Sequence, residues 1–102
     1  GRGVKIAGDI KVVETDHKAR KLIRIYSEIQ GVVLKDIKIT GDFFAIPKES
    51  IITLEAMLED VTLDESMVRE VVNQFYEESK ANIPGIKPDD FVEAVMKIKG
   101  YI

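Results

Sequence analysis

The spacing of apolar residues changes halfway along the chain, and this change limits the possible folds more than any other feature. In the first 40 residues, apolar side chains recur at every second position, as in half-buried strands. From residue 50 onward they recur every three or four positions, as in amphipathic helices. A block of strands followed by a block of helices predicts an α+β fold, because each apolar helix face needs a sheet face to cover.

The first half predicts a three-stranded antiparallel meander, because its strands are separated by short breaks. We place the breaks at the polar run Thr15–Lys18 and at Gln30-Gly31, where glycine suits a tight turn. The side chains that we expect to face the core are Val4, Ile6, Ile10 and Val12 in the first strand, Ile23, Ile25 and Ile29 in the second, and Val33, Ile37 and Ile39 in the third.

The second half predicts three helices packed on one face of that sheet. Ser50 and Asp64 are the expected N-caps of the first two helices, and Pro88 fits the first turn of the third, which Gly100 would end. No internal repeat or linker divides residues 1–102, so we expect one domain. The expected apolar stripes are Ile51, Leu54, Leu58 and Val61, then Val68, Val71, Val72 and Phe75, then Phe91, Ala94, Val95 and Ile98.

The composition excludes most catalytic machinery. The chain has no cysteine and a single histidine, His17, which falls in a predicted turn. It has no glycine-rich phosphate loop, no serine beside a base, and carboxylates such as Glu55 that we place on solvated helix faces. We therefore predict no catalytic residue and no metal site in this chain, and no activity of the chain alone.

The charge is unevenly distributed. Residues 1–48 carry ten basic and six acidic side chains, whereas residues 49–102 carry five and twelve. The net charge of −3 argues against a general nucleic-acid-binding domain. The chain contains no apolar run of membrane-spanning length and no signal-peptide pattern, so we expect no membrane association and a cytoplasmic location.

The segment Thr40–Phe44 ends the third predicted strand and is the most distinctive in the chain. Gly41 indicates a bend or a place where another backbone comes close, and Asp42 beside it can bond its own backbone or cap a turn. If the strand continues, Phe43 and Phe44 point to opposite faces and one ring is available to a partner. If the chain turns at Gly41, both rings are buried under the first helix, and we take this as the default expectation.

An ordered set of motifs resembles the C-terminal accessory domain of lipoate–protein ligases. The set comprises Lys21–Ile25, the strand from Gly31 that ends in Gly41-Asp42-Phe43-Phe44, and Leu54-Glu55 with Leu58, followed by Ile83–Ile86 and Phe91. It spans about residues 18–99. Two positions depart from the family pattern: Asp60 stands where glycine is common, and Ala19-Arg20 stands where Gly-Gly is common.

The resemblance implies a role in a ligase whose chemistry resides elsewhere. In this family a large catalytic domain binds ATP and lipoate and carries the catalytic lysine, and in archaea and some bacteria the two parts are separate chains. The resemblance therefore implies a small, non-catalytic subunit that binds the large subunit in a heterodimer and enables formation of lipoyl-AMP. ATP, Mg²⁺ and lipoate would be bound only in the assembled complex, and the acceptors would be lysines of lipoyl domains.

The expected contact residues are Gly41, Asp42, Phe43 and Phe44, with Lys21 and Arg24 from the basic group that also holds Lys18 and Arg20. This group could meet an acidic partner surface or nucleotide phosphate, or it could be a solvated strand edge. The alternative function is a nucleic-acid-binding or general protein-interaction module that uses the basic half of the chain.

Overall fold

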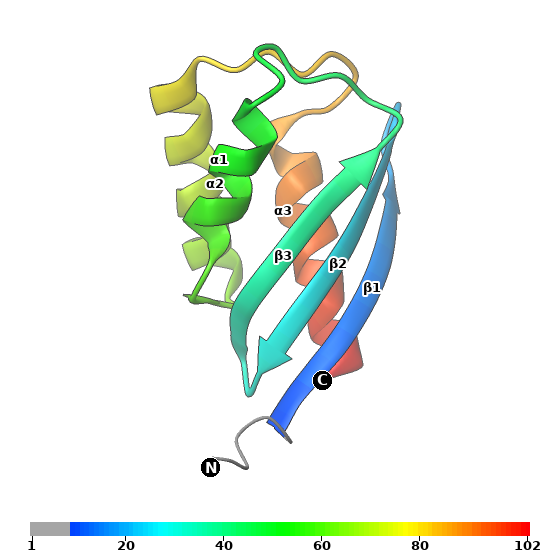
Figure 1. Ribbon diagram of the computed structural model, residues 1–102, viewed down its shortest axis with the longest axis vertical. Helices are drawn as coiled ribbons and strands as arrows, with labels where there is room; N and C mark the ends of the chain where they lie inside the picture. Colours follow the sequence, from blue (N-terminus) through cyan, green and yellow to red (C-terminus); the bar gives the residue numbers. More distant parts are fainter. Residues whose placement is uncertain (1–8) are drawn as a thin grey trace.

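The computed structural model describes residues 9–102 as a four-stranded antiparallel sheet whose one face is covered by three helices (Figure 1). The predicted α+β class and the three-stranded meander are confirmed, with a very short fourth strand added at the edge. The elements in chain order are β1 (Ile10–Lys18), β2 (Leu22–Gln30), β3 (Val33–Gly41), α1 (Ser50–Leu58), β4 (Val61–Thr62), α2 (Glu65–Ser79), α3 (Pro88–Met96) and the 3₁₀ helix η2 (Lys97–Tyr101).

The core lies between the sheet and the helices. Helix α3 packs on β1 and β2, α1 packs on β3, and α2 packs against both other helices. The central strand β2 presents Ile23, Ile25 and Ile29 to this core, as the alternation predicts, and all three are at most 1% exposed. Ser27 lies on the same face and donates a hydrogen bond to the Val13 carbonyl at 2.7 Å, so its buried hydroxyl is satisfied.

The prediction of which face of β1 points into the core is wrong. Val13, Thr15 and His17 point inward, whereas Ile10 and Val12 are 39% and 55% exposed. The predicted break at Thr15–Lys18 is the second half of β1, and the turn follows it at residues 19–21. The β1–β2 register explains the reversal, because it sets the inward residues of β1 opposite those of β2, and a one-residue offset exchanges the faces of a strand. Val4 and Ile6 lie outside the described residues.

The third strand contains a β-bulge that changes which of its residues are buried. Ile29 is paired with Leu34 and Glu28 with Asp36, so Lys35 is an extra residue in β3. Leu34 is consequently fully buried, and Val33, which we expected in the core, is half-buried. The predicted core positions Ile37 and Ile39 are confirmed.

The helix boundaries follow the sequence signals in part. Pro88 begins α3, as predicted, but Ser50 lies inside α1 with its hydroxyl buried and unpaired among the described residues. Val61, expected on the first helical stripe, lies in β4. Helix α3 ends at Met96 and the chain continues as η2, so Gly100 does not end it.

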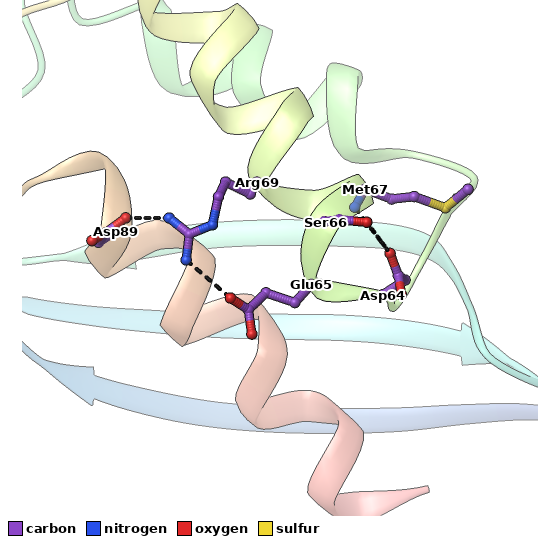
Figure 2. Close-up of polar contacts among 6 residues, drawn as sticks. All are labelled: Asp64, Glu65, Ser66, Met67, Arg69 and Asp89. Atoms are coloured by element: carbon purple, nitrogen blue, oxygen red, sulfur yellow. Dashed lines mark hydrogen bonds and ion pairs between the residues drawn. The ribbon is translucent and has the colours of Figure 1, made fainter.

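Polar side chains fix the ends of α2 and α3 (Figure 2). Asp64 is the N-cap of α2, as predicted, and accepts hydrogen bonds from the Ser66 hydroxyl at 2.7 Å and the Met67 amide at 3.1 Å. These bonds, the one from Ser66 foremost, lower the pKa of Asp64. Arg69 of α2 bridges Glu65 and Asp89, which joins α2 to the first turn of α3.

Candidate partner-binding site

Gly41 is a point of close backbone approach, as its position at the end of β3 predicts. A Cβ placed on this residue would lie 2.0 Å from the Leu22 carbonyl oxygen, which is far inside van der Waals contact. No other residue type fits here without movement of β2. The glycine therefore lets the end of β3 lie directly against the start of β2.

Asp42 completes this junction. Its Oδ1 accepts a hydrogen bond from the Leu22 amide at 2.7 Å, so the peptide groups on both sides of Leu22 contact the Gly41-Asp42 pair. The preceding turn is closed by a hydrogen bond from the Ala19 amide to the Lys21 carbonyl at 2.9 Å. Lys21 thus lies next to the Gly41–Phe44 segment.

The two adjacent phenylalanines have opposite roles, so the default expectation that both are buried is wrong. Phe43 turns inward and packs edge to face on Phe91, with 6.1 Å between the ring centroids. Phe44 points outward and is 75% exposed. It borders a hollow of about 310 Å³ on the β3 edge, which is lined by Ile39, Thr40, Gly41, Phe43, Phe44, Ala45, Lys48 and Ile51.

Three connections meet at this end of the molecule (Figure 1). The 19–21 turn is tied to the 42–49 loop through the Asp42–Leu22 hydrogen bond. The 42–49 loop is tied to the 80–87 loop by two backbone hydrogen bonds of 2.9 Å between Ile46 and Asn82. The 80–87 loop also contacts the 19–21 turn, because a Cβ on Gly85 would lie 3.0 Å from the Lys21 side chain. We call this set of residues 19–21, 42–49 and 80–87 the three-loop end.

Arg24 is separate from the three-loop end. It lies within β2 on the sheet face opposite the helices, where its Nε is 2.9 Å from Asp16 Oδ1 on the neighbouring strand. This hydrogen bond and the charge of Asp16 raise the pKa of Arg24. Of the predicted site residues, the structure brings together Lys21, Gly41, Asp42, Phe43 and Phe44, and places Arg24 in a cross-strand ion pair.

Glu55 has a structural role that the sequence analysis missed. Its Oε2 accepts a hydrogen bond from the Ile39 amide at 2.8 Å, so α1 satisfies a donor on the free edge of β3. Leu54 and Leu58 on either side are fully buried. The Leu-Glu-x-x-Leu pattern is thus an attachment of α1 to β3, which holds the hollow beside Phe44 in shape.

His17, expected in a surface turn, is 7% exposed beneath α3. Its Nε2 lies 3.2 Å from Asp90 Oδ1 and 4.0 Å from Glu93 Oε1. Nearby, burial and the charge of Asp90 raise the pKa of Tyr76 to about 12. The second oxygen of Asp90 accepts the Lys87 amide at 2.8 Å, so the histidine contact belongs to the anchoring of α3.

Across residues 9–102, no three histidine, cysteine or carboxylate side chains are grouped to hold a metal ion. No helix in the described range has the length and apolar content needed to cross a bilayer. Asp60, one of the two departures from the resemblance, has φ of +66° and thus adopts the left-handed conformation that glycine favours.

Comparisons with known proteins agree with this architecture. A family model described as the bacterial lipoate protein ligase C-terminus matches residues 22–95. Subunit 2 of lipoate–protein ligase A from Thermoplasma acidophilum is 38% identical over 82 residues, which are 79% of this chain and 84% of that protein.

A solved structure of a bipartite lipoate protein ligase and its E2 lipoyl domain from the same archaeon contains a chain of similar fold. The TM-score is 0.76 at 33% sequence identity, and the match covers 84% of this chain and 96% of that one. The segment that the family model matches includes β2, β3, α1, α2 and all but the last residue of α3, and with them the Gly41–Phe44 motif and Glu55. This protein therefore belongs to the family of lipoate–protein ligase C-terminal domains.

Proposed function

We propose that this chain is the small second subunit of a two-chain lipoate–protein ligase. It binds the large catalytic subunit in the cytoplasm and enables that subunit to activate lipoate with ATP to lipoyl-AMP. The activated lipoyl group is then transferred to a lysine of a lipoyl domain. Family membership over residues 22–95, together with the hydrogen bonds that join the loops at one end of the domain, supports this proposal most strongly.

The contribution of the chain is positional. Adenylate formation needs the lipoate carboxylate and the α-phosphate of ATP held in line and away from water. A subunit that binds the competent conformation of the catalytic subunit more tightly than its other conformations shifts the population toward it. Such a subunit needs no reactive group, which fits a chain whose single histidine, His17, contacts Asp90.

We assign docking to Phe44, presented by Gly41, Asp42 and Phe43. Phe43 is anchored on Phe91 and Asp42 on the Leu22 amide, so the neighbouring Phe44 is held outward before any partner binds. A preformed apolar contact costs less ordering entropy on binding than a mobile one. ATP, Mg²⁺ and lipoate bind the catalytic subunit in this proposal, and this chain supplies no ligand to them.

The test is lipoyl-AMP formation by the catalytic subunit from lipoate and ATP, measured with and without this chain. We expect formation only when both chains are present, and none with this chain alone. Transfer from preformed lipoyl-AMP to a lipoyl domain, measured in parallel, should depend less on this chain. Equal adenylation in its absence would refute the proposal.

A further inference from the structure

The three-loop end carries positive charge on a negatively charged protein. Its three segments hold five basic and two acidic side chains, a net charge of +3, in a chain whose net charge is −3. All five basic side chains are exposed. They are Arg20, Lys21, Lys48, Lys80 and Lys87.

These cations are uncompensated, unlike three of the other basic side chains in the described range. Lys35, Arg24 and Arg69 each have a carboxylate within ion-pair distance. Among residues 9–102, none of the five at the three-loop end has one. The one carboxylate that reaches across the loops, Asp42, accepts the Leu22 amide instead.

The hydrogen bonds among the loops hold these charges together. Lys80 and Lys87 flank the loop that Asn82 joins to Ile46, and Lys48 follows Ile46 in the neighbouring loop. Lys21 packs its aliphatic stem beside Gly85. Like charges fixed at one end of a small domain repel one another, and an acidic partner surface relieves that repulsion.

We propose that the three-loop end recognises an acidic surface on the catalytic subunit, with an apolar recess for Phe44 at its centre. This inference rests on the proposed function and adds the chemistry of the partner's face. The two features act on different rate constants. The cations accelerate association by electrostatic steering, and the phenyl ring slows dissociation.

The experiment measures association and dissociation rates with the catalytic subunit at low and high salt for two matched double variants. Lys21→Glu/Lys48→Glu reverses two charges at the three-loop end, and Lys11→Glu/Lys99→Glu reverses two in the first residues of β1 and in η2, which lie toward the opposite end of the molecule (Figure 1). Each substitution changes the charge by −2, so both double variants have a net charge of −7. Circular dichroism verifies that both fold.

We expect the first double variant to associate about tenfold more slowly at low salt and to lose most of the salt dependence of the wild-type rate. The control pair should stay within about threefold of wild type, because its charges lie toward the opposite end of a molecule 43 Å long, where their effect on the contact is weaker. Phe44→Ser should raise the dissociation rate and leave the salt dependence of association unchanged.

Equal effects of the two double variants would overturn the inference, because they would reflect net charge alone. Binding of a single-stranded RNA oligonucleotide that is lost only in the first double variant, with ligase association unchanged, would also overturn it. If the wild-type chain failed to bind the catalytic subunit at all, the proposed function itself would be wrong.

Discussion

Replacement of Gly41 by alanine tests whether the junction between β2 and β3 holds the candidate site in place. The added Cβ would lie 2.0 Å from the Leu22 carbonyl oxygen and 2.8 Å from two ring carbons of Phe43. To reach ordinary contact at 3.4 Å, the backbones of β2 and β3 must separate by about 1.4 Å, since a backbone carbonyl cannot rotate away as a side chain can. That movement also strains the Asp42–Leu22 hydrogen bond of 2.7 Å.

Overpacking of this kind costs about 2–3 kcal/mol, which lowers Tm by roughly 10 °C in a domain of this size. The assay is urea denaturation followed by far-ultraviolet circular dichroism, with the midpoint and slope fitted to two states. Gly100→Ala is the matched control, because a Cβ there meets no atom within 4 Å. We expect the control to stay within about 0.5 kcal/mol of wild type. A Gly41→Ala protein as stable as the control would refute the reasoning.

Three further predictions concern single side chains. Asp64→Ala should lower the urea midpoint at neutral pH, because the Met67 amide at the start of α2 loses its acceptor. Hydrogen bonds lower the pKa of Asp64 in the folded protein, so the contribution of its carboxylate is present at neutral pH and lost as the pH falls through that depressed pKa. Wild type and variant should therefore converge in stability during acid denaturation, and a constant difference would contradict this role. Glu55→Ala should cost about 1–2 kcal/mol, because the Ile39 amide loses its acceptor, and equal urea midpoints would contradict this role. Tyr76→Phe should leave Tm unchanged or slightly raised, because the buried hydroxyl has no partner among the described residues, and a fall of several degrees would contradict that assignment.

The sequence was sufficient to predict the elements whose apolar pattern is unambiguous. β2 alternates isoleucine with polar residues, and α3 begins at Pro88 with a clear helical stripe, so the buried face of β2 and the start of α3 were predicted correctly, although the end of α3 was not. Asp64 was identified as an N-cap from its type and place alone. In each case the signal is local.

The errors arose where a distant contact decides the outcome. In β1 the adjacent Val12 and Val13 allow either face of the strand to point into the core. The face that does so is decided by the register with β2 and by the contact of His17 with Asp90. The bulge at Lys35 has no local marker. Such features become visible only when segments far apart in the chain are brought together.

In the candidate site, too, features with a local sequence signal were predicted and features that depend on distant contacts were not. A close backbone approach at Gly41 was one of two expectations from its residue type, but Asp42 was expected to bond its own backbone or cap a turn, and its partner, Leu22, was not identified. The separate orientations of Phe43 and Phe44 depend on Phe91, which the chain reaches some 50 residues later. The link between Ile46 and Asn82 likewise has no sequence signature.

The most direct test of the account is a titration of the catalytic subunit with wild-type chain, Phe44→Ser and Val32→Ser, with lipoyl-AMP formation as the readout. Val32 is 52% exposed at the turn between β2 and β3, remote from the three-loop end, and so controls for removal of an exposed apolar side chain. The account predicts that Val32→Ser activates like wild type, whereas Phe44→Ser needs at least about tenfold more protein for half-maximal activation. Identical activation curves for all three proteins would contradict it.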